Sequence, residues 1–234
     1  MNSSFNVSVL AFDVFGTVVD WHGSIVEEVR ALQLNCNESE FARAWRAGYQ
    51  PAMARVRSGE LGWTRIDDLH RIILDDVLLQ FDLDLEEQQR VDLNLAWHRL
   101  NPWPDVVEGL HQLRRQFTTC TLSNGNLSLL ANMAKRAELP WDLILSAEVF
   151  RAYKPDARTY LGVASTFDIE PDEVMLVAAH HDDLQAAREC GLRTAYIERP
   201  EEFGKDSQKD VSPQPGNDFH ATSFIDLAGQ LRVL

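Results

Sequence analysis

The stretch from residue 106 to residue 197 alternates between short apolar runs and helical patterns, and this alternation most constrains the fold. The predicted strands, each short and apolar, are at residues 118–122, 143–146, 174–178 and 194–197. The predicted helices are at residues 106–115, 127–137, 158–167 and 184–190. Because strand–helix–strand repeats require parallel strands joined by helical crossovers, we expect an α/β fold with a Rossmann-like sheet.

A further apolar run, residues 7–12, stops at Asp13 and is followed by Gly16 and Thr17. The run predicts a buried strand with an acid at its carboxyl end, which is where open α/β sheets bind ligands. A carboxylate there is costly to desolvate unless donors surround it. Asp13 is therefore either a functional acid or a residue that caps the next turn.

Residues 21–97 show helical spacing of apolar side chains without strand-like alternation, which predicts about four helices. The Asn-Pro-Trp-Pro stretch at 101–104 ends this helical insert. We therefore predict a Rossmann-like core of residues 1–20 and 102–234 and an inserted α-helical cap domain of residues 21–101. Within the core, Gly191 is expected to cap a helix in the left-handed conformation, and residues 200–217 to form a surface loop before a last strand and helix.

The net charge of −14 argues against nucleic acid or an anionic membrane as partner, but a locally positive site can still bind a small anion. Cys36, Cys120 and Cys190 are scattered without metal-binding spacing, as in proteins with reduced thiols. The first residues show no signal-peptide pattern, and no apolar run has the length of a membrane span. These features predict a cytoplasmic protein.

Polar residues follow several predicted strands at their carboxyl ends: Asp13, Ser123–Asn124, Lys154 and residues 180–183. Each has a structural explanation, because Ser123–Asn124 could cap a helix, Lys154 could lie in solvent, and Asp182 and Asp183 could complement a helix dipole. In a parallel sheet, however, these ends meet at one crevice. Together the residues predict a single site.

Four motifs occur in a fixed order: DVFGT at 13–17, LSNG at 122–125, YKPD at 153–156 and VAAHHDDL at 177–184. Over nearly the whole chain, the sequence resembles the haloacid dehalogenase superfamily, including a cap inserted after the first strand. The branch that it resembles most is that of the L-2-haloacid dehalogenases, metal-independent enzymes that convert 2-haloacids to 2-hydroxy acids with inversion. The resemblance implies a small anionic substrate, no cofactor and, because the family often forms dimers, a homodimer.

The resemblance assigns roles to four charged residues. Asp13 is the nucleophile that forms an aspartyl ester, and Lys154 holds Asp13 oriented and ionised. Arg46, in the cap, matches the arginine that receives the departing halide. Asp183 matches the acid that positions or activates water for hydrolysis of the ester.

The resemblance also implies a substrate-binding set. Ser123 and Asn124 would bind the substrate carboxylate, and Thr17 would donate a hydrogen bond to the same region. Tyr160 matches an active-site tyrosine of the family, although an aromatic side chain in a helix core is an equal explanation.

Three positions depart from the family pattern. His180 stands in place of Asn, Asp182 in place of a frequent Trp, and Phe15 in place of the usual Tyr. His180 could act as the hydrolytic base or merely donate a hydrogen bond. The substrate range is expected to depend on cap side chains such as Tyr49, Trp63 and Arg65.

Two alternative functions are a magnesium-dependent small-molecule phosphatase and a non-catalytic binding protein of the same superfamily. Phosphatases of the superfamily have acids at the positions of Phe15 and Ala179, and few hard oxygen ligands for Mg²⁺ remain without them. Phosphoryl transfer without a metal would be slow, whereas halide leaves without a proton. The presence of Asp13, Lys154 and Asp183 argues against a site without turnover.

Overall fold

The computed structural model describes residues 6–233, and its centre is a sheet of six parallel strands. The strand order is β5-β4-β1-β6-β7-β8. The strands are β1 (Val9–Phe12), β4 (Thr118–Ser123), β5 (Leu143–Ser146), β6 (Val174–Ala178), β7 (Arg193–Ile197) and β8 (Phe219–Ala221). The predicted α/β fold with a Rossmann-like sheet is confirmed.

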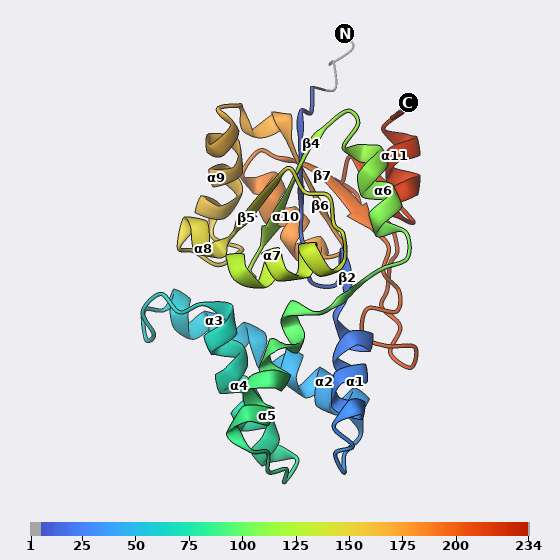
Figure 1. The fold of residues 1–234 in the computed structure, drawn as a ribbon. Helices are drawn as coiled ribbons and strands as arrows, with labels where there is room; N and C mark the ends of the chain where they lie inside the picture. Colours follow the sequence, from blue (N-terminus) through green and yellow to red (C-terminus); the bar gives the residue numbers. More distant parts are fainter. Residues whose placement is uncertain (1–5, 234) are drawn as a thin grey trace.

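Strand β1 lies in the interior of the sheet and is buried on both faces. Since successive side chains of a strand point to opposite faces, Val9 and Ala11 pack in one apolar cluster and Leu10 and Phe12 in the other. The first cluster includes residues of α9 (Ala157–Phe167) and α10 (His181–Glu189). The second includes residues of α6 (Val106–Leu113), α7 (Leu127–Arg136) and α11 (Phe224–Gln230). Helices therefore cover both faces (Figure 1).

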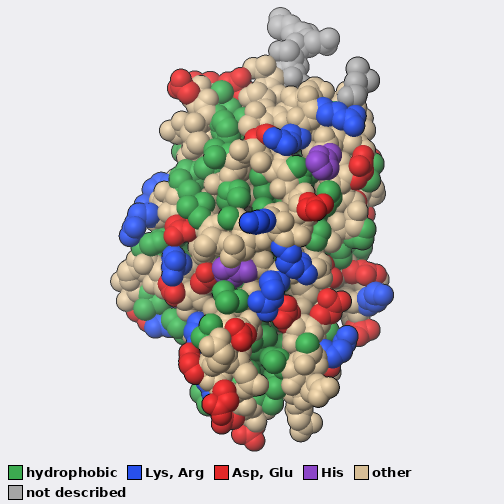
Figure 2. Space-filling view, in the orientation of Figure 1, with side chains coloured by type: hydrophobic (Ala, Val, Ile, Leu, Met, Phe, Trp, Pro, Cys, Tyr) green, Lys and Arg blue, Asp and Glu red, His purple; other side chains and the backbone are tan. Residues whose placement is uncertain are grey.

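The helices of the insert lie together at the carboxyl end of the sheet (Figure 1). They are α1 (Trp21–Ala31), α2 (Glu38–Ala47), α3 (Tyr49–Arg57), α4 (Ile66–Gln80), α5 (Glu87–Asn94) and the 3₁₀ turn η1 (Leu95–His98). They begin after β2 (Val19–Asp20) and end before β3 (Asn101–Pro102), and these two short strands pair antiparallel. Figure 2 shows basic and acidic side chains interspersed where the insert meets the sheet.

Several details differ from the sequence prediction. The insert has one helix more than the four expected, because the chain breaks between α2 and α3 at Gly48. Pro51 accounts for the break, since its ring has no N–H and would clash with the carbonyl of residue 47 in a continuous helix. Helix α8 (Ala147–Phe150) and the β2–β3 pair were not predicted, since elements this short show no periodicity. Gly191 has the expected positive φ, +87°.

The segment from residue 198 to residue 218 has no helix or strand, as expected of a loop. The prediction of a surface loop is nevertheless wrong at Glu202, whose residue surface is 1% exposed. Within residues 6–233, no helix is both long and apolar enough to cross a membrane. Cys36, Cys120 and Cys190 are free thiols.

Helices α6 and α11 approach each other closely at Gly109. A Cβ at this position would lie 2.3 Å from Cβ of Phe224 and 2.9 Å from the carbonyl carbon of Phe224. We therefore expect Gly109→Ala to lower the free energy of unfolding by about 1–3 kcal/mol, although alanine is the better helix former. Gly229→Ala is the control, because a Cβ there meets nothing within 4 Å, and it should be neutral or stabilising. Urea unfolding measures both changes, and a neutral Gly109→Ala would contradict the packing argument.

Candidate active site

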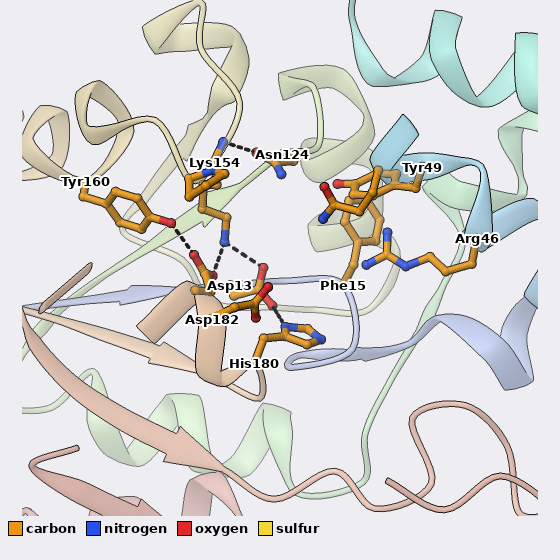
Figure 3. Close-up of a pocket in the computed structure, with 12 residues that line it drawn as sticks. Asp13, Phe15, Arg46, Tyr49, Asn124, Lys154, Tyr160, His180 and Asp182 are labelled. Atoms are coloured by element: carbon orange, nitrogen blue, oxygen red, sulfur yellow. Dashed lines mark hydrogen bonds and ion pairs between the residues drawn. The ribbon is translucent and has the colours of Figure 1, made fainter. Parts of the chain in front are cut away.

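The candidate site lies at the carboxyl end of the central strands. Phe12 pairs with Thr121 and Val177, so the loops after β1, β4 and β6 begin at nearly the same level. Arg46 and Tyr49 reach the same space from α2 and α3 (Figure 3). These elements enclose a cavity of about 150 Å³.

Asp13 is buried in this cavity and has a donor on each carboxylate oxygen. Its Oδ1 accepts a hydrogen bond from Nζ of Lys154 at 2.9 Å, and its Oδ2 accepts one from Oγ1 of Thr17 at 2.7 Å. Nδ1 of His180 lies 3.1 Å from the same Oδ2. Burial opposes ionisation of Asp13, but the Lys154 charge and the His180 hydrogen bond outweigh it and hold the pKa of Asp13 far below its ordinary value. Asp13 is therefore a carboxylate at neutral pH.

Lys154 bridges two carboxylates, since its Nζ also lies 2.5 Å from Oδ2 of Asp183. Burial lowers the pKa of Lys154, but the two carboxylates reverse this effect and raise it. Oδ1 of Asp183 accepts a hydrogen bond from the Tyr160 hydroxyl at 2.6 Å. Burial raises the pKa of Asp183 more than Lys154 lowers it. Tyr160 packs in an apolar cluster of the core and also lines the cavity.

His180 connects Asp13 to a second acid. Its Nε2 lies 2.8 Å from Oε1 of Glu202, while its Nδ1 faces Asp13. Burial lowers the pKa of His180, but the charge of Glu202 and the hydrogen bonds to both carboxylates raise it to about 9. His180 is therefore an imidazolium at neutral pH in this state. Both ring nitrogens face carboxylate oxygens, and a role as base requires that the ring first lose a proton.

Glu202 is a charged residue next to the site that sequence reasoning missed. Its Oε2 is 2.6 Å from Nζ of Lys209, and Nε1 of Trp21 donates to its Oε1 at 3.3 Å. Burial raises the pKa of Glu202, but His180 and Lys209 outweigh burial and lower it to about 2. Glu202 lies in a mostly polar loop outside the four motifs, so no sequence pattern indicated that it reaches the site.

The interaction of His180 with two carboxylates predicts a pH-dependent stability. The pKa of His180 is about 9 in the folded protein and 6.5 for a free histidine, so its contribution is fully present below pH 6.5 and disappears as the pH rises through 9. We expect the loss to be on the order of 2–3 kcal/mol. Urea unfolding at pH 6 and pH 9 should show a smaller pH effect in His180→Asn than in wild type or in His111→Asn, a change on an exposed helix position. Equal pH effects in all three proteins would rule out this coupling.

Arg46 and Tyr49 line the side of the cavity that faces Asp13 (Figure 3). The guanidinium carbon of Arg46 lies 4.1 Å from the centre of the Tyr49 ring, and Nη1 of Arg46 is buried without a hydrogen-bond partner among the described residues. Phe15 packs edge-on against Tyr49, with 6.4 Å between ring centres. Because an unpaired buried donor is costly, this guanidinium is suited to accept an anion from the cavity.

The other predicted binding residues differ in how they meet the cavity. Asn124 lines it, and Oδ1 of Asn124 accepts a hydrogen bond from the backbone N–H of Lys154 at 2.8 Å. Ser123 is fully buried, and its Oγ accepts a hydrogen bond from the backbone N–H of Gly125 at 3.1 Å. Thr17 contacts the site through its hydrogen bond to Asp13. The suggestion that Ser123–Asn124 cap a helix is wrong, since the residue before α7 is Asn126.

The cavity also includes residues that the sequence did not single out as binding groups. Gln50 and Pro155 line it, and so does Asp182. Of the cap side chains expected to govern substrate range, Tyr49 is in the cavity. Trp63 instead packs on Tyr153, with 5.0 Å between ring centres, and Arg65 pairs with Asp68 on the surface.

The residues present do not fit a Mg²⁺ ion. Mg²⁺ requires several hard oxygen ligands in octahedral order, and Phe15 and Ala179 offer no side-chain oxygen. The carboxylate oxygens of Asp13 already bind cationic and hydroxyl donors. In the part of the chain that the structure describes, no group of three or more acidic, histidine or cysteine side chains is placed to hold a metal.

Fold and site together define a Rossmann-like α/β protein whose helical insert closes over the carboxyl end of the sheet. A family model described as haloacid dehalogenase-like hydrolase matches residues 7–191. The chain therefore belongs to the haloacid dehalogenase-like hydrolases, as its motifs suggested.

Individual relatives agree with this assignment. The chain is 29% identical to (S)-2-haloacid dehalogenase 1 of a Pseudomonas species, over 84% of this chain and 88% of the relative. It is 30% identical to (S)-2-haloacid dehalogenase 4A of Burkholderia cepacia, over 80% of this chain and 81% of the relative. A solved L-2-haloacid dehalogenase is 44% identical with a TM-score of 0.91, over 96% of this chain and 99% of that one. A solved defluorinating L-2-haloacid dehalogenase is also 44% identical, with a TM-score of 0.93, over 97% and 95%.

Proposed function

We propose that the protein hydrolyses short 2-haloacids to 2-hydroxy acids without a metal, through an aspartyl ester on Asp13. The observation that carries the proposal is that an ionised, buried carboxylate and the Arg46 guanidinium, whose buried Nη1 has no partner among the described residues, line one cavity of about 150 Å³. Such a space suits a small acid. The names of the relatives, which are haloacid dehalogenases, support the same substrate class.

In the first step, a carboxylate oxygen of Asp13 forms a bond to Cα of the substrate while the carbon–halogen bond breaks on the opposite side. The bonding electron pair leaves with the halide, and Arg46 binds the negative charge that develops. Lys154 keeps Asp13 ionised and oriented. We assign the substrate carboxylate to the loop at Ser123 and Asn124. Because halide leaves without a proton, this step needs no general acid. Phe15, at the position of the acid in phosphatases, therefore does not slow it.

In the second step, water attacks Cγ of the esterified Asp13 and the bond from Cγ to the ester oxygen breaks. The 2-hydroxy acid leaves, and Asp13 returns to a carboxylate with one oxygen from water. Asp183 and His180 are the two acid–base groups next to Asp13, the first through Lys154 and the second directly. A positioned base contributes about 10²–10⁴-fold to such a step.

This division of labour follows the two parts of the chain. We infer that residues 1–20 and 102–234 form the catalytic core, which supplies Asp13, Lys154 and Asp183. Residues 21–101 form a cap domain that supplies Arg46 and Tyr49. A cytoplasmic location is part of the same proposal and agrees with the free thiols.

The test is halide release from L- and D-2-chloropropionate, chloroacetate and fluoroacetate in the presence of EDTA. We expect release from at least one of them, and fluoroacetate is included because a 44% identical protein is described as defluorinating. Intact-mass analysis of a rapidly quenched reaction should show the covalent ester. No halide from any of the four, with cleavage of p-nitrophenyl phosphate when Mg²⁺ is added, would contradict the proposal and favour a phosphatase.

A further inference from the structure

Six buried or half-buried charged groups form a continuous row through the site, with alternating sign. The row runs Asp183, Lys154, Asp13, His180, Glu202 and Lys209. Its five links join oxygen and nitrogen atoms at 2.5, 2.9, 3.1, 2.8 and 2.6 Å. The row is neutral as a whole when every group is ionised. The dehalogenation chemistry uses its first half directly and leaves its second half, beyond His180, without an assigned role.

We propose that Glu202 is a positioning residue that makes His180 the proton acceptor for hydrolysis of the Asp13 ester. The proposal rests on the proposed function, because it concerns the second step of that reaction. Glu202 is suited to this role by its placement. It is 1% exposed, and Lys209 and Trp21 fix its two oxygens, so it holds Nε2 of His180 in one orientation.

Formation of the ester changes the charge next to His180. The ionised Asp13 becomes a neutral ester, so the imidazolium loses one of the two carboxylates that stabilise it. The cations that remain nearby, Lys154 and Arg46, then favour release of the Nδ1 proton to solvent. Because Nε2–H stays bound to Glu202, the lone pair of the neutral ring is on Nδ1, the atom that faces Asp13.

The protons of the hydrolytic step balance. Neutral His180 takes a proton from water at Nδ1 as the water oxygen bonds to Cγ of Asp13. The tetrahedral intermediate collapses, and the bond from Cγ to the ester oxygen breaks. The leaving alkoxide receives one of the two protons of the attacking water, and the other remains on His180. The imidazolium and the Asp13 carboxylate are thereby restored, and each turnover releases one proton and one halide.

Asp183 is less suited to accept that proton. Its Oδ2 is bound by Lys154 at 2.5 Å and its Oδ1 by the Tyr160 hydroxyl at 2.6 Å, so both oxygens have strong donors. Although burial raises the pKa of Asp183, both of its oxygens already accept these hydrogen bonds, and Lys154 stands between Asp183 and Asp13. Asp183 lies on the far side of Lys154 from Asp13 in the row, and its contacts suit it to hold Lys154 in place.

Water can reach His180 from a second cavity. This cavity, of about 340 Å³, shares Arg46, Tyr49 and His180 with the first one and is also lined by Glu202. The imidazole therefore borders both spaces. The second cavity offers a route for the incoming water and for the proton that leaves.

The first test compares Glu202→Gln with Glu201→Gln, a matched change at the neighbouring exposed residue. Quenched-flow reactions with a substrate that the wild type turns over give the rate of ester formation and the rate of ester hydrolysis separately. We expect Glu202→Gln to slow hydrolysis by about 10–100-fold, so that the ester accumulates, while ester formation changes by less than about fivefold. Glu201→Gln should match the wild type. Equal slowing of both steps, or no slowing of hydrolysis, would overturn the proposal.

The second test is a cycle with His180→Asn, which keeps a hydrogen-bond donor but removes the base. If Glu202 acts through His180, adding Glu202→Gln to His180→Asn should slow hydrolysis by less than about twofold further. Additive effects of the two changes would show that Glu202 acts independently and would overturn the proposal. If Glu202→Gln does not fold, Glu202→Gln/Lys209→Met removes the ion pair as a unit and carries the same expectations.

A third measurement needs no substrate and separates failure of this inference from failure of the proposed function. Nitrogen-15 NMR of the histidine rings should show a lower pKa for His180 in Glu202→Gln than in wild type, by at least about one unit, and no change in Glu201→Gln. An unchanged value would overturn the positioning role even if halide is released. Absence of halide release by the wild type would instead overturn the proposed function together with the catalytic part of this inference.

Discussion

Asp13→Asn is expected to reduce halide release by at least about 10⁴-fold, the largest effect of any single substitution in the protein. An amide oxygen is a poor nucleophile, so the ester on which both steps depend does not form. The amide also carries no charge to pair with Lys154 and His180. Halide release and intact-mass analysis of the quenched reaction measure the loss directly.

The control for this experiment is Asp76→Asn, which removes an exposed carboxylate from helix α4 and should leave the rate unchanged. Thermal unfolding of both variants establishes that they are folded. Halide release by Asp13→Asn within about tenfold of wild type would show that the nucleophile lies elsewhere, since loss of a nucleophile costs far more than this.

Lys154→Met is expected to combine a loss of activity with a loss of stability. Without the ammonium, Asp13 and Asp183 lose the cation that lies between them, and Asp13 keeps donors only on Oδ2, from Thr17 and His180. We expect halide release to fall by about 10³-fold. The free energy of unfolding should fall by about 3–5 kcal/mol at pH 8, because removal of one partner leaves buried charge uncompensated.

The pH dependence of this variant gives a second readout. In Lys154→Met the pKa values of the two carboxyl groups rise above those of the unfolded chain, so their contribution to stability is lost as the pH rises through the raised values. The free energy of unfolding should therefore differ more between Lys154→Met and wild type at pH 8 than at pH 5. Urea unfolding at both values measures it, with Lys135→Met, an exposed lysine of α7, as control. A pH-independent difference would contradict the coupling.

The sequence predicted the sheet and the placement of Asp13 because both depend on local patterns. Apolar runs that end in a polar residue identify the strands and the side of the sheet to which the site belongs. Lys154, His180 and Asp183 were placed by the same reasoning, since residues 180–183 follow one predicted strand and Lys154 lies in the loop after another. The structure brings all four together within hydrogen-bond distance.

The missing parts of the prediction depend on contacts between distant segments. Glu202 contacts Trp21, which is 181 positions away, and its loop is mostly polar, so no local pattern distinguishes Glu202 from the exposed Glu201 beside it. The direction of the Ser123 side chain depends on the backbone of one turn. The stacking of Arg46 on Tyr49 depends on the packing of two helices in the insert.

The β2–β3 pair has a consequence for how such proteins can diversify. The chain leaves the sheet and returns to it through two adjacent strands, with Val19 opposite Pro102 and Asp20 opposite Asn101. Because both ends of the insert lie at this strand pair, helices of other lengths or sequences can replace it without changing the order of the six core strands. Asp13 and Lys154 belong to the core, whereas Arg46 and Tyr49, which line the same cavity, belong to the insert. A change in the insert can therefore reshape one wall of the cavity while Asp13 and Lys154 stay in place.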